Sequence, residues 1–392
     1  MISLQEARRI ITAMVAPRPA VAVPLDQALG RVLAEAILSD DFYPPGDRSQ
    51  MDGYVVRGEA VPGTFRLAGE IPAGAVPEQP LQPGECYRIF TGALLPPGVG
   101  RVIMQEDAVA EGPHIRLETF GPRRFVREKG SEAVPGQILL PAGTRLGGVE
   151  LAMLAQAGAV QPRVIPAPAV HHVATGGELV DPAERPGPGR IRDTNSSLLR
   201  ALLTGHGVTR FSTRRVGDDP VAMAAAAETT DDLLLMSGGA SVGDYDFGAA
   251  TLERLGWTVH FNRVNLRPGK PLTFATRGRQ AAFVIPGNPV SHFVCYHAAI
   301  RLAVECAAGL PPSWPAVWLE LGDASLLEPD PRETWWPATA SAKDGILQVD
   351  PKPWSSSGNT FSLAGTNALV QVNASSPREG RALTLLLEPP AS

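Results

Sequence analysis

Two aspartates end a glycine-rich loop in the middle of the chain. The loop SGGASVGDYD, residues 237–246, follows an apolar run of leucine and methionine and precedes a helical pattern. Glycines allow backbone N–H groups to close around an anion, and the start of a helix adds positive potential. Asp244 and Asp246 supply hard oxygen ligands of the kind that hold Mg²⁺ together with a phosphate. The loop therefore indicates a metal–phosphate site, although a tight turn with a capping aspartate would have a similar sequence.

The same loop differs from the two common nucleotide-binding motifs. No Lys-Ser or Lys-Thr pair follows its last glycine, as a Walker A loop requires. No GxGxxG follows any expected strand either. Neither a P-loop nucleotidase nor a nicotinamide enzyme is therefore favoured.

Three cationic side chains come shortly before a second loop of this kind. Arg263, Arg267 and Lys270 belong to NRVNLRPGKP, and the loop IPGNPVS follows at residues 285–291. Residues four apart on a strand share a face, so Arg263 and Arg267 are expected to converge. Three cations beside carboxylates suit a site for an oxyanion, whereas a solvated basic edge is the alternative.

The histidines do not suggest a site. His171 and His172 are adjacent, so they face opposite sides of a strand. His292 and His297 are five residues apart and do not share a helix face. We expect all four to have structural or exposed positions.

Alternating strands and helices must position these loops. The segments AVHHVATGGE (169–178), DDLLLMS (231–237) and AAFVIPGNP (281–289) each read as a strand that runs into a loop. Helical patterns follow in NSSLLRALLTGHG, in FGAATLERLG and from IPGNPVS to about Ala308. Such repeats predict a parallel sheet with helices on both faces. Ligands bind at the carboxyl ends of the strands in sheets of this kind, so the three loops should gather there.

The rest of the chain is expected to form further helical and β units. An S-x-x-E capping box at residues 3–6 starts an amphipathic helix, and a second helix is expected at about 25–36. From residue 54 to about 140, short apolar runs between Gly and Pro indicate a small β domain. Residues 148–158 return to a helical pattern, so this β domain looks inserted. After residue 311, short strands and turns predict a second β unit.

Composition fits a globular protein of two to four structural units. The 392 residues are 44% hydrophobic and 19% charged, and the net charge of -5 argues against a general nucleic-acid binder. No signal peptide is evident and no apolar run reaches about 18 residues, so we expect a cytoplasmic protein without a membrane segment. The three cysteines lack CxxC spacing, and we expect buried thiols without a disulfide or a metal at Cys86, Cys295 and Cys306.

Together these segments resemble the molybdopterin molybdenumtransferase family, which includes the bacterial MoeA proteins and the matching domain of gephyrin. The resemblance covers nearly the whole chain, and its motifs occur in the family's order. They are SQMDGYVV (49–56), RIFTGALLP around Thr91, GSEAVPGQILL, TGGELVDP (175–182), DTNS (193–196), SGGASVGDYD, LRPGKP and IPGNPVS, with SSSGNTFSLAGTNAL near the C-terminus.

The resemblance implies a fold class and a division into domains. The expected fold is multidomain α/β plus β, with a doubly wound parallel-sheet domain that binds molybdopterin. The implied domains are an elongated helical dimerisation part (1–44 and 141–167), an inserted β domain (45–140), the α/β domain (168–312) and a C-terminal β barrel (313–392). A homodimer with active sites shared between subunits is also implied.

The resemblance implies a reaction as well. Adenylated molybdopterin and molybdate would be the substrates, Mg²⁺ the divalent metal, and AMP and molybdenum cofactor the products. Carboxylates would hold Mg²⁺ on the diphosphate, while cations hold molybdate, so positioning and charge neutralisation would carry the rate. The upstream adenylyltransferase and molybdoenzyme apoproteins or chaperones are the implied protein partners, with no nucleic acid and no membrane.

The positions that match the family's functional residues fall into three groups. The expected catalytic residues are Asp52, Glu178, Asp218 and Asp246. The expected metal ligands are Asp244, Asp246 and Glu178. The expected substrate-binding residues are Thr91, Ser237, Gly238, Gly239, Ser241, Gly243, Arg263, Arg267, Lys270, Pro286, Gly287, Asn288, Pro289 and Ser291.

Three positions depart from the family pattern: Gly177 replaces an aspartate, Glu132 is a longer carboxylate, and Gln50 replaces a small residue. Two alternative functions stay open. An adenylyltransferase, whose domain resembles residues 168–310, would not need the inserted β domain or the last unit. A molybdopterin carrier or scaffold would not need carboxylates for Mg²⁺, so the carboxylates and cations together favour the enzyme.

Overall fold

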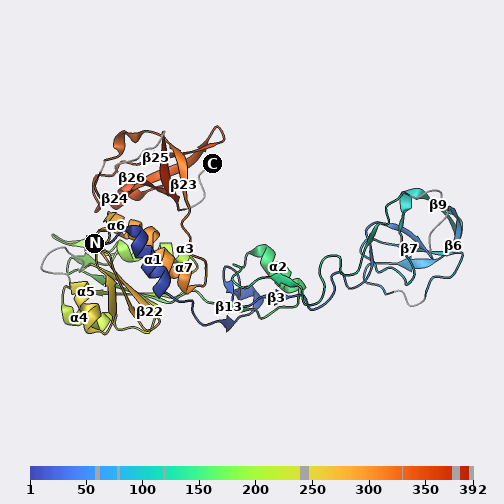
Figure 1. Ribbon diagram of the computed structural model, residues 1–392, viewed down its shortest axis with the longest axis horizontal. Helices are drawn as coiled ribbons and strands as arrows, with labels where there is room; N and C mark the ends of the chain where they lie inside the picture. Colours follow the sequence, from blue (N-terminus) through green and yellow to red (C-terminus); the bar gives the residue numbers. More distant parts are fainter. Residues whose placement is uncertain are drawn as a thin grey trace. The chain divides into compact units, whose positions relative to one another are not determined.

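The computed structural model describes most of the chain and divides it into two compact units (Figure 1). We call them the main unit (Met1–Val23, Gly30–Ala34 and Arg163–Ser392) and the second unit (Pro24–Leu29 and Glu35–Pro162). The described residues are 1–57, 62–76, 80–117, 121–238, 247–328, 330–372 and 380–387.

A six-stranded sheet forms the centre of the main unit. Its strand order is β17 (Phe211–Val216), β14 (Val170–Thr175), β18 (Leu233–Ser237), β22 (Gln280–Ile285), β21 (Thr273–Arg277) and β19 (Thr258–Phe261). The first four strands are parallel, as predicted, whereas β21 and β19 are antiparallel to their neighbours. Only a tight turn around Gly278 separates β21 from β22, and a connection that short joins antiparallel strands only.

Helices cover both faces of this sheet (Figure 1). Along β18, Leu233 and Leu235 belong to one apolar core, and Leu234 and Met236 belong to another. This alternation is that of a strand buried on both faces. The helices on the first face are α1 (Leu4–Met14), α3 (Asn195–Gly205), α6 (Pro289–Cys295) and α7 (Arg301–Ala307), and those on the second are α4 (Pro220–Ala227) and α5 (Phe247–Arg254).

The helix that follows β22 is continuous, as predicted. A π-helical turn at Tyr296–Ile300 joins α6 to α7. The structure places the N-terminal helix differently from the domain grouping that the resemblance implied. Leu4 and Ile11 of α1 are buried in the same core as Leu199 of α3, so this helix packs with the α/β sheet.

A β barrel forms the C-terminal part of the main unit. The strands β24 (Glu333–Lys343), β25 (Ile346–Pro351), β23 (Ala316–Leu321), β27 (Arg381–Leu386) and β26 (Ala368–Val372) pair in this order, and β26 pairs back with β24. This closure confirms the predicted barrel. The short strand β20 (Leu266–Arg267) pairs with the start of β24 and so links the barrel to a loop of the α/β sheet.

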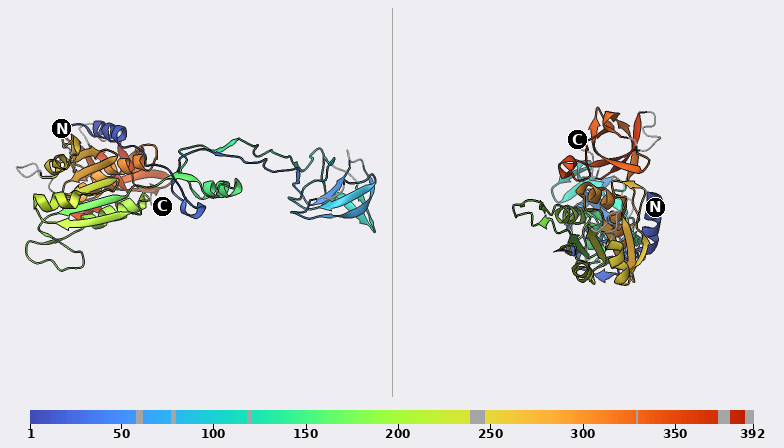
Figure 2. Two further views of the ribbon diagram at one scale, coloured as in Figure 1. Left: turned by 90° about the horizontal axis from the view of Figure 1, so that it is seen from below. Right: turned by 90° about the vertical axis from the view of Figure 1, so that its left-hand side faces the viewer.

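The second unit contains the predicted β domain, with strands coloured blue to cyan in Figure 2. Its sheet has the order β8 (Ile103–Met104), β5 (Gly53–Val56), β7 (Glu85–Ile89), β6 (Gly63–Ile71), β10 (His114–Leu117) and β9 (Ala108–Glu111). The helix α2 (Gly148–Gln156) follows, as predicted. Two-stranded pairs join β3 (Ile37–Leu38) to β12 (Ile138–Leu140) and β4 (Arg48–Ser49) to β11 (Val126–Arg127).

The predicted helix at 25–36 is wrong. A single 3-10 turn, Leu25–Gln27, is followed by Gly30 at φ 74° and then by β2 (Val32–Leu33). The left-handed conformation at Gly30 ends any helical path. Val32 and Leu33 are buried and pair with β13 (Arg163–Ile165), a partner far away in the sequence, so tertiary pairing overrides the local pattern.

The three cysteines are free and buried, which confirms their predicted burial. Within the described ranges, no helix is both long and apolar enough to cross a membrane.

Candidate active site

Three loops leave the carboxyl ends of β14, β18 and β22 and contact one another. Thr175 Oγ1 donates to the carbonyl oxygen of Ser237 at 2.7 Å, and the N–H of Gly238 donates to the carbonyl oxygen of Ile285 at 3.0 Å. A Cβ atom at Gly238 would lie 2.5 Å from Thr175 Oγ1, so this close approach requires glycine. The loops therefore gather at one edge of the sheet, as predicted.

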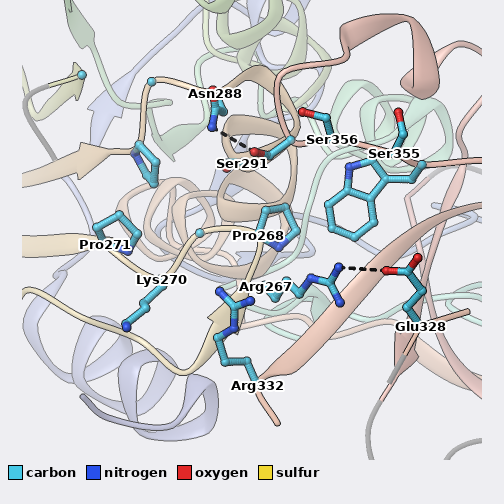
Figure 3. Close-up of a pocket in the computed structure, with 16 residues that line it drawn as sticks. Arg267, Pro268, Lys270, Pro271, Asn288, Ser291, Glu328, Arg332, Ser355 and Ser356 are labelled. Carbon is cyan, nitrogen blue, oxygen red and sulfur yellow. Dashed lines mark hydrogen bonds and ion pairs between the residues drawn. The ribbon is translucent and has the colours of Figure 1, made fainter. Parts of the chain in front are cut away.

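A cavity at this edge has a volume of about 760 Å³, and we call it the anion cavity. Arg267, Lys270 and Arg332 bring three cationic side chains to it (Figure 3). The other lining residues are Gly238, Pro268, Gly269, Pro271, Pro286, Gly287, Asn288, Ser291, Glu328, Trp354, Ser355, Ser356 and Ser357. Cations, serine hydroxyls and loop backbone suit a compact oxyanion.

Arg267 is held from the barrel side of the anion cavity. Its guanidinium nitrogens lie 3.4 Å from a carboxylate oxygen of Glu328 and 3.5 Å from one of Asp330. Its guanidinium carbon also lies 5.3 Å from the centre of the Trp354 ring. These contacts fix the side chain, and the long separations from the carboxylates leave its charge available to a ligand.

Asp330 pairs more closely with Arg332 than with Arg267. Arg332 donates to both carboxylate oxygens of Asp330, at 2.8 and 2.9 Å. The hydrogen bonds from Arg332 lower the pKa of Asp330 to about 2. Lys270 forms no ion pair with any residue that the structure describes, so the cavity has an excess of positive charge.

The second cavity has a volume of about 640 Å³, and we call it the carboxylate cavity. Glu178, Asp193 and Asp218 line it together with two arginines. The other lining residues include Thr175, Gly176, Leu179, Arg190, Ile191, Arg192, Asn195, Ser237, Gly238, Gly287, Asn288, Pro289, Gly358, Thr360 and Phe361. Because Gly238, Gly287 and Asn288 line both cavities, the two cavities are neighbours.

Gly177, the departure from the family's aspartate, lies against Asp218. The N–H of Gly177 donates to Asp218 Oδ2 at 3.0 Å, and a Cβ atom at this glycine would lie 3.5 Å from the same oxygen. An aspartate at this position would therefore bring a second carboxyl group close to Asp218. With glycine, this end of the carboxylate cavity has one negative charge fewer.

The predicted metal ligands are only partly described. Glu178 lines the carboxylate cavity, whereas Asp244 and Asp246 lie outside the described residues. Among the residues that are described, no three His, Cys, Asp or Glu side chains are close enough to hold a metal ion. The predicted substrate-binding residues Gly239, Ser241 and Gly243 also lie outside the described residues.

Most of the other predicted site residues line one of the two cavities. Those in the anion cavity are Gly238, Arg267, Lys270, Pro286, Gly287, Asn288 and Ser291. Those in the carboxylate cavity are Glu178, Asp218, Ser237, Gly238, Gly287, Asn288 and Pro289.

Arg263 lines neither cavity. The expectation that it shares a strand face with Arg267 is wrong, because β20 begins only at Leu266. Arg263 is exposed, and its carbonyl oxygen accepts from the N–H of Ile2 at 3.1 Å. The spacing of the two arginines in the sequence therefore does not bring both side chains to the anion cavity.

Asp52 and Thr91 belong to the second unit and contact each other. Both the backbone N–H and the hydroxyl of Thr91 donate to Asp52 Oδ1, each at 2.7 Å. These hydrogen bonds, the backbone one first, lower the pKa of Asp52. The carboxylate is therefore ionised and held in one orientation near neutral pH.

Sequence reasoning missed the residues that the barrel contributes. Arg332 lies in PRETWWP, which contains no recognisable motif, and Trp354 precedes the serines of SSSGN. In this part of the chain, only the Ser-Gly segment resembles a motif of the family. Asp193 belongs to the DTNS motif but is not among the predicted site residues, although it lines the carboxylate cavity.

Two family descriptions match this chain. Residues 2–158 match the family described as "MoeA N-terminal region (domain I and II)", and residues 172–305 match a "Probable molybdopterin binding domain".

Curated relatives and solved structures agree with these matches. The molybdopterin molybdenumtransferase of Nostoc sp. is 37% identical over 364 residues, which cover 89% of this chain and 84% of the relative. The enzyme of that name from Bacillus subtilis is 32% identical, with the same coverage. A molybdopterin biosynthesis MoeA protein from Pyrococcus horikoshii has a TM-score of 0.82 at 25% identity and covers 99% of both chains.

Proposed function

Because the chain belongs to the molybdopterin molybdenumtransferase family, we propose that it inserts molybdenum into molybdopterin during molybdenum cofactor biosynthesis. Its substrates are molybdate and adenylated molybdopterin, and its products are AMP and molybdenum cofactor. The observation that carries this proposal is the pair of neighbouring cavities, one rich in cations and one rich in carboxylates.

The anion cavity is the proposed site for molybdate. Arg267 and Lys270 supply positive charge from the loop that follows Arg263, and Arg332 supplies it from the barrel. The hydroxyls of Ser291 and of the serine segment add hydrogen-bond donors. A doubly charged tetrahedral oxyanion needs several such donors in a fixed arrangement.

The carboxylate cavity is the proposed site for the phosphate groups of the adenylated pterin. Glu178 and Asp218 offer hard oxygen atoms, which suit Mg²⁺ held jointly with a phosphate, and Asp244 and Asp246 would complete the ligand set. Mg²⁺ needs only one or two carboxylates when a phosphate and water molecules supply the other ligands. A bound Mg²⁺ would neutralise charge on the diphosphate; the protein's own groups would hold the two substrates next to each other.

A shared active site in a homodimer is part of the same proposal. The main unit carries Glu178, Asp218 and Arg267, and the second unit carries Asp52 and Thr91. Family resemblance supports the assignment of both groups to one reaction. A second copy of the chain would supply the group from the second unit by two-fold symmetry.

The partners and location follow from the chemistry of the substrates. An adenylyltransferase upstream must supply the activated pterin, and molybdoenzyme apoproteins or chaperones must receive the product. We propose a cytoplasmic location, which agrees with three free, buried thiols.

The alternative functions are not favoured. The match to the MoeA N-terminal region extends over residues 2–158, which a stand-alone adenylyltransferase does not need. A carrier that only holds the pterin has no use for the cations of the anion cavity.

Incubation with adenylated molybdopterin and Mg²⁺, with and without molybdate, tests the proposal. We expect AMP release and active cofactor only when molybdate is present, the cofactor being scored by reconstitution of an apo-molybdoenzyme. Failure to form cofactor under saturating substrate would contradict the proposal.

A further inference from the structure

Ser237, the last residue of β18, lies between two buried histidines. Its Oγ is 2.6 Å from Nε2 of His172 on β14 and 2.6 Å from Nε2 of His292 on α6. Both histidines are 0% exposed and Ser237 is 3% exposed. We call these three residues the histidine clamp.

The outer nitrogen of each imidazole lies near a polar group, and for His292 that group fixes the position of the proton. Nδ1 of His292 lies 3.2 Å from the carbonyl oxygen of Asn288, which can only accept, so this nitrogen carries a proton. The hydroxyl of Ser196 donates to Asp193 at 2.5 Å, which uses its single proton. Nδ1 of His172 lies 3.2 Å from the oxygen of the same hydroxyl.

The proton positions have a consequence at the centre of the clamp. Burial lowers the pKa of His172 to about 3 and that of His292 to about 4, so both imidazoles are neutral near pH 7. Because His292 is neutral and has its proton on Nδ1, its Nε2 is unprotonated and can accept a hydrogen bond. The hydroxyl of Ser237 gives its single proton to this nitrogen, so the equally short contact with His172 requires a proton on Nε2 of His172. Ser237 thus donates to one imidazole and accepts from the other, and both hydrogen bonds hold its oxygen in place.

The histidine clamp adjoins the proposed substrate site. Ser237 and Asp193 line the carboxylate cavity, and Gly238, the next residue of the glycine loop, lines both cavities. Thr175 Oγ1 holds the backbone carbonyl of Ser237 at 2.7 Å. The side chain and the backbone of Ser237 are thus both fixed where the loop begins. A displaced Ser237 would carry Gly238 with it.

We propose that His172 and His292 are positioning residues that hold Ser237, and through it the start of the glycine loop, in place for the phosphate groups of the adenylated pterin. Neither histidine touches a substrate; both act through the serine. The identity of the substrate rests on the proposed function, whereas the arrangement of protons in the clamp does not.

Steady-state kinetics of His292→Leu and His172→Leu test the positioning role. The KM for adenylated molybdopterin should rise about tenfold, as is common when a supporting hydrogen bond is lost. The molybdate concentration for half-maximal rate should change less, because the three cations of the anion cavity are untouched although Gly238 lines that cavity too. His292→Gln, whose amide oxygen can accept from Ser237, should recover most of the loss.

His260→Leu is the matched control. Its Nε2 also contacts a hydroxyl, Thr276 Oγ1 at 2.8 Å, but it lines neither cavity. This variant should leave both constants unchanged. Equal weakening of both substrates by the clamp variants, or no rescue by His292→Gln, would overturn the positioning role.

Nitrogen-15 NMR of the full-length wild-type protein tests the clamp without any activity measurement. Near neutral pH, His292 should show a protonated Nδ1 and an unprotonated Nε2, and His172 should show the reverse. A proton on Nε2 of His292, or an unprotonated Nε2 in both residues, would overturn the proposed arrangement. Wild-type protein that releases no AMP but shows these two tautomers would refute the proposed function and leave the clamp intact.

Discussion

Arg267 and Arg263 are four residues apart, yet only Arg267 lines the anion cavity. Replacement of Arg267 by Ala should raise the molybdate concentration for half-maximal rate on the order of tenfold or more, because charged hydrogen bonds contribute about 1.5–3 kcal/mol each. The KM for adenylated molybdopterin should change less, since that substrate makes many more contacts. Kinetics with each substrate varied in turn measure both constants.

Arg263→Ala is the matched control for that variant. Because Arg263 is exposed and lines neither cavity, its removal should change the molybdate dependence by less than about twofold, as for other surface charges. Equal loss of affinity for both substrates in Arg267→Ala would contradict the assignment of the anion cavity to molybdate.

The ion pair of Asp330 with Arg332 predicts an acid-dependent stability. The pKa of Asp330 lies at about 2, below its ordinary value of 3.8, so the pair stabilises the fold above about pH 4. That contribution is lost as the pH falls through 2. Asp330→Asn should lower the free energy of unfolding by about 1 kcal/mol at pH 7, and the difference from wild type should shrink as the pH approaches 2.

Urea denaturation at pH 7 and pH 3 measures this difference. Glu328→Gln is the control, because its contact with Arg267 is 3.4 Å long and its side chain is 71% exposed. It should cost less than about 0.5 kcal/mol at either pH. A loss in Asp330→Asn that is the same at both pH values would show that the charge of Asp330 is not its cause.

At the scale of elements, the packing of α5 on β22 depends on a glycine. A Cβ atom at Gly248 would lie 2.5 Å from Cγ1 of Val284. Alanine favours a helix over glycine by about 1 kcal/mol, whereas overpacking of a core costs about 1–3 kcal/mol. The cost of the clash should exceed the gain in helix propensity, so we expect Gly248→Ala to lower the free energy of unfolding measured by urea denaturation.

Two further variants check the cause of that loss. Ala250→Gly, on the exposed side of the same helix, should cost about 1 kcal/mol through helix propensity alone. Adding Val284→Ala to Gly248→Ala should recover part of the loss, because it removes the methyl groups that clash. A Gly248→Ala protein that is more stable than wild type would mean that α5 does not pack this closely.

Local patterns were sufficient to predict the elements around the site. The strand–loop–helix repeats specified β14, β18 and β22 with their following helices, because each strand and each helix has its own local pattern in a continuous stretch of sequence. The helix predicted at residues 25–36 is wrong for the opposite reason. Its two-residue strand β2 exists only because Val32 and Leu33 pair with β13, and no local periodicity carries that information.

The same distinction explains which site residues could be predicted. Arg267, Lys270 and Glu178 lie in motifs that are continuous in the sequence. Arg332 reaches the anion cavity because the barrel closes against the α/β loops, and residues 172 and 292 meet only through Ser237. Contacts of this kind depend on three elements at once, so spacing along the chain does not reveal them.

At the scale of the whole molecule, the shared-site proposal predicts complementation between inactive subunits. Homodimers of Asp52→Ala and of Asp246→Ala should each be nearly inactive. A mixed dimer would have one site in which both aspartates are intact, supplied by different chains. Random exchange makes roughly half of the dimers mixed, each with one good site, so recovery should reach at most about a quarter of wild-type activity.

Mass spectrometry must first confirm that mixed dimers have formed. Two inactive variants of the main unit, Asp246→Ala and Glu178→Ala, are the control pair. In their mixed dimers each site has a defect, so exchange should restore nothing. Absence of recovery in the first pair would place each active site within a single chain.

The measurement that tests molybdenum insertion most directly is the ratio of AMP released to molybdenum incorporated in a single turnover. Enzyme in excess over adenylated molybdopterin, with saturating molybdate and Mg²⁺, should release one AMP for each molybdenum atom that becomes bound to the pterin. The amount of AMP should fall to background when molybdate is omitted. AMP release at the same rate without molybdate, with no molybdenum in the product, would contradict the proposed function and identify the protein as a hydrolase of the adenylated pterin.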